Sequence, residues 1–136
     1  MSNIIEFTGI KIISEEEFNN KHYWGIHASI DLYGCDPELI KSFPDIKKYV
    51  AELCQLIDMK MHGETLVERF AEGYYEGVSM MQFIETSSIT AHFDERENRA
   101  FLDIFSCKYF DGEKVAEYSK TFFKAEKSTL RMMYRN

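Results

Sequence analysis

Hydrophobic and polar residues alternate with a period of two in several parts of the chain. In Tyr23–Tyr33 (YWGIHASIDLY) one set of alternate positions is apolar and the other is mostly small or polar. The apolar set is Trp24, Ile26, Ala28, Ile30 and Leu32. Arg99–Cys107 alternates in the same way, with Phe101, Asp103, Phe105 and Cys107 on one side and Ala100, Leu102, Ile104 and Ser106 on the other. A period of two predicts strands with one buried face.

Two other segments follow a helical period. After Ser42-Phe43-Pro44-Asp45, apolar residues fall at i, i+4, i+7, i+8 and i+11, namely Ile46, Val50, Leu53, Cys54 and Ile57. This spacing predicts a helix with one apolar face. Asp111 can cap a second helix, in which Val115, Tyr118, Phe122 and Phe123 lie near one face,. Asp36-Pro37 also has the form of a helix N-cap followed by a first helical residue,.

The remaining elements have weaker patterns. The patterns of Val78–Ile84 and Ser88–Phe93 indicate strands. The gap between them is too short for a hairpin turn, so we interpret them as one long, bent or bulged strand,. Further strands are expected at Met59–Phe70 and in the tail Ser128–Asn136, with a short strand at Ile4–Ile13. The segments between the regular elements are expected to form a turn at Asn19–Asn20, a loop at Ala71–Glu76 and a polar turn at Asp94–Asn98.

The order of these elements predicts an α+β fold. We expect a two-layer sandwich, with a mainly antiparallel sheet and two helices packed on one face. Residues 1–136 form a single domain in this prediction, and residues 1–21 are a variable N-terminal extension,.

The composition of the chain argues against several classes of function. The net charge of −7 disfavours non-specific nucleic-acid binding,. No signal-peptide pattern opens the chain and no apolar run reaches the roughly 18 residues of a membrane span, so a cytoplasmic protein without a membrane partner is expected,. Three cysteines without C-x-x-C spacing and four scattered histidines favour neither a disulfide framework nor a metal site,.

Groups capable of covalent chemistry concentrate in residues 77–107. Thr86-Ser87-Ser88 interrupts an apolar region, and His92 and Cys107 follow. Taken singly, each has an ordinary explanation: the hydroxyls satisfy backbone groups near a bend, the histidine is packed and the cysteine is a small buried hydrophobe. A Ser–His–Asp hydrolase is disfavoured because no G-x-S-x-G motif occurs,.

The combined spacing is more specific. Gly77-Val78-Ser79 is followed after eight residues by Ser87, then after five by His92 and after fifteen by Cys107, within the segment LDIFSC. This arrangement resembles the prokaryotic S-adenosylmethionine decarboxylase family, which is pyruvoyl-dependent. HASIDLYGCDPELI and the Arg69-Phe70 pair add to the resemblance, which covers about residues 24–125.

The resemblance implies a role for each matching residue. Ser87 would attack the carbonyl of Thr86, and the chain would cleave itself between these two residues, leaving a pyruvoyl group derived from Ser87. Such a group can form a Schiff base with the substrate amine and accept electrons on decarboxylation. His92 and Ser79 match residues that assist processing, Cys107 matches the acid that protonates the product carbon, and Phe70 matches an aromatic that stacks on the adenine of the substrate. The expected enzyme is a carboxy-lyase in polyamine (spermidine) biosynthesis and a homodimer of processed protomers.

The chain also departs from the family pattern. Thr86 stands where glutamate is usual, Ser88 replaces a histidine, and Phe93-Asp94-Glu95 replaces Thr-Trp-Pro-Glu. Ser88 is therefore an alternative processing residue. Alternative functions are a pyruvoyl-dependent decarboxylase of another amino acid, such as ornithine or arginine, and an unprocessed non-catalytic relative that binds a nucleoside or a partner protein. In a regular strand Ser87 and His92 would face opposite sides, so a bulge or an irregular start of the strand is expected.

Overall fold

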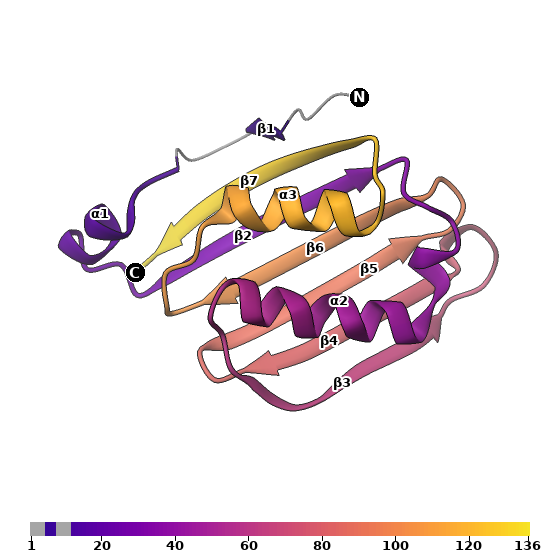
Figure 1. Ribbon diagram of the computed structural model, residues 1–136, viewed down its shortest axis with the longest axis horizontal. Helices are drawn as coiled ribbons and strands as arrows, with labels where there is room; N and C mark the ends of the chain where they lie inside the picture. Colours follow the sequence, from indigo (N-terminus) through magenta and orange to yellow (C-terminus); the bar gives the residue numbers. More distant parts are fainter. Residues whose placement is uncertain (1–4, 8–11) are drawn as a thin grey trace.

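The computed structural model describes residues 5–7 and 12–136, and over these residues seven strands form a single sheet. The strand order is β1-β7-β2-β6-β5-β4-β3, in which β1 runs parallel to β7 and the other neighbouring strands are antiparallel (Figure 1). The bounds are β1 Ile5–Phe7, β2 Gly25–Tyr33, β3 Met61–Phe70, β4 Gly77–Ile84, β5 Ser87–Asp94, β6 Arg99–Ser106 and β7 Lys127–Arg135.

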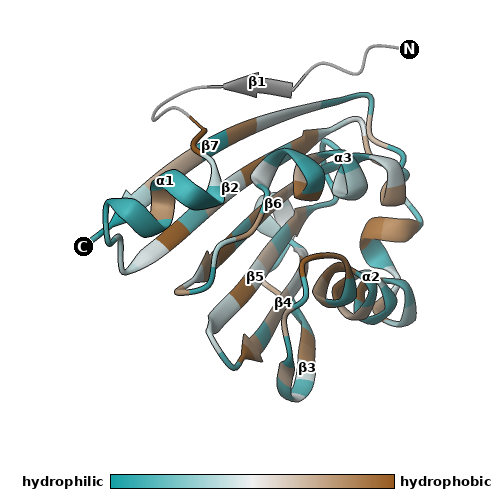
Figure 2. Cartoon of the chain, turned by 60° about the vertical axis from the view of Figure 1, so that its left-hand side comes forward, coloured by the Kyte–Doolittle hydropathy of each residue, from teal (hydrophilic) through white to brown (hydrophobic). Residues whose placement is uncertain are grey.

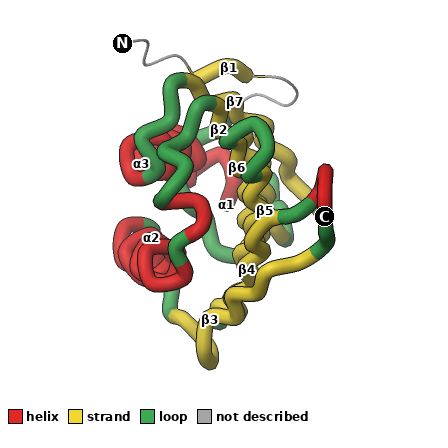
Figure 3. Tube along the Cα trace, turned by 90° about the vertical axis from the view of Figure 1, so that its right-hand side faces the viewer, coloured by secondary structure: helices red, strands yellow, loops and turns green. Residues whose placement is uncertain are grey.

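Two helices, α2 (Phe43–Leu56) and α3 (Gly112–Phe122), cover one face of this sheet (Figure 3). Both begin where the sequence predicts, because the N-cap side chains satisfy free backbone amides: Ser42 Oγ accepts from Asp45 N–H at 3.2 Å, and Asp111 accepts from two amides of the first turn of α3,. Within the described part of the chain, no helix is both long and apolar enough to cross a membrane.

The core lies between the helices and the sheet. Along β2 the residues Ile26, Ala28, Ile30 and Leu32 are fully buried, whereas their neighbours face the opposite, open side of the sheet. Figure 2 shows the same alternation as hydrophobic and hydrophilic bands along the strands. The α+β two-layer sandwich is therefore confirmed. Trp24 departs from the pattern: it precedes β2 and is 61% exposed, stacked on Phe105.

The predicted single bent strand across residues 78–93 is wrong. β4 and β5 are two antiparallel strands, and Ile84 pairs with Ser87 across a two-residue loop, Glu85-Thr86. Two residues are enough to reverse a chain when the flanking strands pair directly. This hairpin places Thr86 and Ser87 at the tip of the sheet.

The N-terminal predictions also need correction. A short helix, α1 (Glu15–Asn20), occupies the place of the turn expected at Asn19–Asn20, and Ser14 Oγ caps it by accepting from Glu17 N–H. Of the strand expected at Ile4–Ile13, Ile5–Phe7 is strand, residues 12–13 are not, and residues 4 and 8–11 lie outside the described residues. The helix start expected at Asp36-Pro37 is wrong: Asp36 Oδ1 accepts from Glu38 N–H at 2.8 Å in a turn, and only a short 3-10 turn, η1 (Leu39–Lys41), follows with Glu38 as its N-cap.

Candidate active site

Ser79 and His92 face each other across β4 and β5. They are direct cross-strand partners, and Ser79 Oγ lies 2.8 Å from His92 Nδ1 on the open face of the sheet. A hydrogen bond to Nδ1 fixes the orientation of the imidazole ring and leaves Nε2 available for proton transfer.

The same two residues line a cavity of about 500 Å³ on the open face. Phe70, at the end of β3 and 56% exposed, forms another part of its wall. Most of the lining surface is apolar, and Glu68, the cross-strand partner of Ser79, is one of the lining residues. An exposed aromatic ring in an acidic protein suits a ligand that carries positive charge,.

The other three predicted site residues gather at the tip of the hairpin. The backbone N–H of Cys107 donates to the carbonyl oxygen of Thr86 at 2.9 Å. Ser87 is the first residue of β5 and pairs with Ile84 on one side and Ser106 on the other. Its φ of 156° lies in a region that residues with side chains rarely occupy,. The peptide between Thr86 and Ser87 is thus held at its carbonyl and strained at its following residue.

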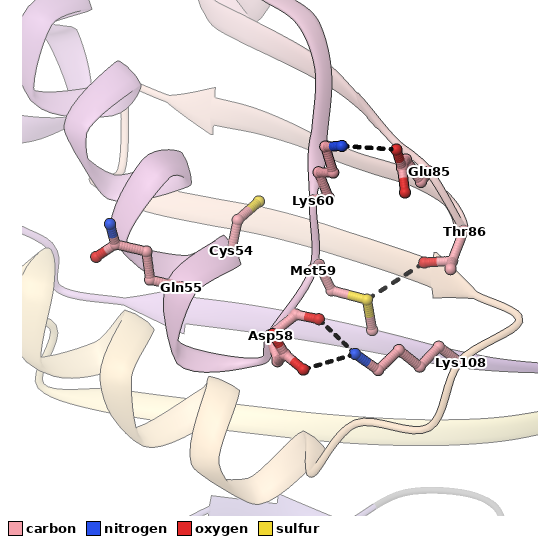
Figure 4. Close-up of a pocket in the computed structure, with 8 residues that line it drawn as sticks. All are labelled: Cys54, Gln55, Asp58, Met59, Lys60, Glu85, Thr86 and Lys108. Atoms are coloured by element: carbon pink, nitrogen blue, oxygen red, sulfur yellow. Dashed lines mark hydrogen bonds and ion pairs between the residues drawn. The ribbon is translucent and has the colours of Figure 1, made fainter.

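A second cavity, of about 610 Å³, lies beside this tip, at the end of α2 (Figure 4). Thr86 Oγ1 points into it and donates to Met59 Sδ at 3.2 Å. Two ion pairs border it: Lys60 with Glu85 at 3.4 Å, and Lys108 with Asp58 at 2.9 Å. Lys108 Nζ also donates to the carbonyl oxygen of Asp58 at 2.6 Å, which ties the segment after Cys107 to the end of α2.

Within one chain the predicted site residues therefore form two separate groups. Ser79, His92 and Phe70 form one, and Thr86, Ser87 and Cys107 form the other. The pairing of β5 is regular from Ser87 to Asp94, so the expected bulge is absent and the positive φ of Ser87 is the only irregularity described there. Five residues of extended chain separate Ser87 from His92 by about 17 Å.

The three thiols differ in access. Cys35 and Cys54 are buried, whereas Cys107 is exposed. Burial raises the pKa of the Cys35 thiol to about 12 and that of the Cys54 thiol to about 11, because an apolar environment disfavours the thiolate,. Of the three, only Cys107 is open to a reactant.

A polar cluster lies next to these groups on the open face. His27 Nε2 and Ser29 Oγ contact Asp103 Oδ1 at 3.1 and 2.8 Å. The hydrogen bond from His27 and, more weakly, that from Ser29 hold the pKa of the Asp103 carboxyl below its usual value, although partial burial opposes this shift,. Asp103 therefore stays ionised beside Thr90, its cross-strand partner, which lines the open-face cavity.

Sequence reasoning did not identify Ser106 and Met59 as part of this site. Ser106 is fully buried, and its Oγ donates to Thr86 Oγ1 at 2.9 Å. One signal was present: Ser106 is the hydroxyl residue on the otherwise apolar side of the Arg99–Cys107 alternation. Met59 carries no such signal, since only the fold brings its sulfur to Thr86.

Comparisons with known proteins agree on one family. The profile of the S-adenosylmethionine decarboxylase family matches residues 26–136. An S-adenosylmethionine decarboxylase proenzyme from Clostridium botulinum (strain Langeland) is 30% identical over 99 residues, covering 72% of this chain and 82% of the relative. A proenzyme of the same name from Pyrococcus furiosus is 29% identical over 103 residues, covering 75% and 71%.

Two further comparisons concern function and fold. An arginine decarboxylase proenzyme from Ignicoccus hospitalis is 31% identical over 104 residues, covering 76% of this chain and 67% of that protein. The crystal structure of the adenosylmethionine decarboxylase from Aquifex aeolicus superposes with a TM-score of 0.69 at 20% identity, covering 84% of this chain and 92% of the other, which supports the fold. Sequence profile and relatives together show that the chain is a decarboxylase, a carboxy-lyase, and that it belongs to the S-adenosylmethionine decarboxylase family.

Proposed function

We propose that this protein is a self-processing, pyruvoyl-dependent S-adenosylmethionine decarboxylase of the cytoplasm that supplies the aminopropyl donor for polyamine synthesis. The observation that carries the proposal is the geometry of the Thr86–Ser87 peptide. It lies at a hairpin tip, its carbonyl accepts a hydrogen bond from Cys107 N–H, and Ser87 has a strained φ of 156°. A strained, polarised peptide that precedes a serine is suited to attack by the serine hydroxyl.

The surroundings of position 87 fit a pyruvoyl group. Ser87 is half-buried, and a small keto-acyl cap would keep its place between Ile84 and Ser106. When present, such a group supplies the electron sink that loss of carbon dioxide from an amino acid requires. No other cofactor is part of the proposal.

The remaining residues have separate proposed tasks. The Ser79–His92 pair assists removal of the Ser87 Cα proton during processing, and Cys107, exposed beside the tip, donates a proton to the product carbon,. Phe70 offers an aromatic face to the adenine and to the cationic sulfonium of the substrate,.

We also propose a homodimer in which the open face meets a second copy. That face exposes the apolar side chains Leu66, Phe70, Met81, Phe83 and Met133, and water-exposed apolar area of this kind favours association. Since one chain holds the Ser79–His92 pair about 17 Å from Ser87 along β5, a partner facing it would bring its own pair to the hairpin tip.

Mass spectrometry of the purified protein tests self-cleavage. We expect fragments 1–86 and 87–136, the second with a blocked amino terminus that reacts with hydroxylamine, and an intact chain for Ser87→Ala. Cleavage before Ser88 instead would yield fragments 1–87 and 88–136 and assign the role to Ser88. A wild-type chain that stays intact on incubation contradicts the proposal.

The substrate has a second candidate, because one relative is named an arginine decarboxylase proenzyme and matches at similar identity. Arginine is also cationic and would find the same Glu68 and Phe70 in the open-face cavity. Carbon dioxide release from S-adenosylmethionine, arginine and ornithine, measured side by side on the cleaved protein, separates these activities.

A further inference from the structure

The side chain of Thr86 belongs to an ordered series of hydrogen bonds. Lys108 N–H donates to Ser106 Oγ at 2.9 Å, Ser106 Oγ donates to Thr86 Oγ1 at 2.9 Å, and Thr86 Oγ1 donates to Met59 Sδ at 3.2 Å. Ser106 Oγ also lies 3.7 Å from Met59 Sδ, so the sulfur is within reach of both hydroxyls,. The side chain of Thr86 is therefore held by Ser106, the last residue of β6, and by Met59 in the loop between α2 and β3.

The residue that follows β6 also holds the main chain of Thr86. Cys107 N–H, next to Ser106, donates to the Thr86 carbonyl oxygen at 2.9 Å. An amide at this distance stabilises negative charge that develops on the oxygen when the carbonyl carbon is attacked. Ser106 and Cys107 thus hold the side chain and the carbonyl of one residue, and movement of either changes the position of the carbonyl.

Ser106 is placed for this task and not for contact with solvent or substrate. It is fully buried, and it faces the helix side of the sheet, away from the open-face cavity.

We propose that Ser106 is a positioning residue for self-cleavage, acting through Thr86. It holds the Thr86 carbonyl on Cys107 N–H while Ser87 Oγ attacks the carbonyl carbon. In that step the Oγ–C bond forms, the C–N bond breaks, and the hydroxyl proton ends on the released amine, so the ester is an isomer of the peptide. The inference rests on the proposed function, because it concerns the same scissile bond.

The test follows the intact full-length chain after cell-free synthesis by mass spectrometry, with and without hydroxylamine, which cleaves the ester. Loss of one hydrogen bond to the reacting residue should slow cleavage of Ser106→Ala about tenfold. Thr86→Val should be slowed similarly, and the double variant by less than the product of the two effects, because both changes remove the shared Ser106–Thr86 hydrogen bond,. Ser106→Thr, which keeps the hydroxyl, should restore cleavage to within about threefold of the wild type.

Ser119→Ala is the matched control. Ser119 is also fully buried and hydrogen-bonded to one hydroxyl, Tyr49 Oη at 2.6 Å, but it lies on α3. Ser119→Ala should lower the midpoint of thermal unfolding about as much as Ser106→Ala does, but it should leave the rate of self-cleavage unchanged. If Ser106→Ala does not fold, the test uses Thr86→Val instead, because Thr86 is only half-buried and its substitution disturbs the core less.

Hydroxylamine shows which step of self-cleavage a variant slows, the formation of the ester or its breakdown. Cleavage of Ser106→Ala should stay slow in its presence, since ester formation is the step affected, whereas His92→Ala should accumulate ester and be cleaved quickly. Wild-type rates for Ser106→Ala, or rescue of that variant by hydroxylamine, overturn the inference while leaving self-cleavage intact. A wild-type chain that never cleaves overturns both.

Discussion

At the scale of single residues, Cys107 is set apart from the other cysteines by its access to solvent. Cys35 and Cys54 are buried in apolar surroundings that raise their pKa to about 12 and about 11, so at neutral pH they carry almost no thiolate, the reactive form,. Cys107 directly follows the last residue of β6 and is exposed. A proton donor that must meet a substrate has to be accessible in this way.

We therefore expect one thiol per folded chain to react with a disulfide reagent such as dithiobis(nitrobenzoate) at pH 8. Cys107→Ser should abolish this fast phase, whereas Cys54→Ser should leave it unchanged. In denaturant all three thiols should react. A fast phase that survives Cys107→Ser would mean that the structure misplaces a buried thiol.

At the scale of elements, the β4–β5 hairpin organises the site, and the close approach of its two strands depends on Gly77. A Cβ at this position would overlap the carbonyl oxygen of Phe93. The glycine of the Gly77-Val78-Ser79 motif is thus a packing requirement of the hairpin. It also sets the register that brings Ser79 opposite His92 two residues further along.

Gly77→Ala should destabilise the fold by about 3 kcal/mol, because backbone must shift to make room. Gly63→Ala is the comparison: nothing lies within 4 Å of a Cβ there, but the φ of 78° makes the substitution strained, so a smaller loss of about 1 kcal/mol is expected. Urea unfolding curves measure both. Equal losses would show that Phe93 and Gly77 are not in close contact.

At the scale of the whole molecule, the division of the predicted site residues into two groups is the reason for the proposed homodimer. A mixed dimer provides the test: a His92→Ala chain and a tagged Ser87→Ala chain are expressed together. If each tip receives the Ser79–His92 pair of its partner, the His92→Ala chain should be cleaved in the mixture and stay intact alone. Sedimentation measures the dimer itself. Failure of complementation in a proven dimer would place the pair in the same chain as the serine that it serves.

Part of this architecture follows from sequence alone, because it depends on neighbours along the chain. The alternation along β2 and β6, the apolar face of α2 and the caps Ser42 and Asp111 are local properties, and each appears in the structure where the pattern predicts it. The spacing of Ser79, Ser87, His92 and Cys107 likewise pointed to the family that the comparisons support.

Tertiary structure decided the rest, since it depends on contacts between distant parts of the chain. Whether residues 78–93 form one strand or two was settled by pairing: β6 and β3 flank the hairpin and leave room for a two-residue loop. The same pairing separates Ser79 and His92 from Ser87 and brings Ser106 and Met59, 20 and 27 residues away in sequence, onto Thr86. Periodicity reports which face a residue occupies, but only the fold determines which residues meet there.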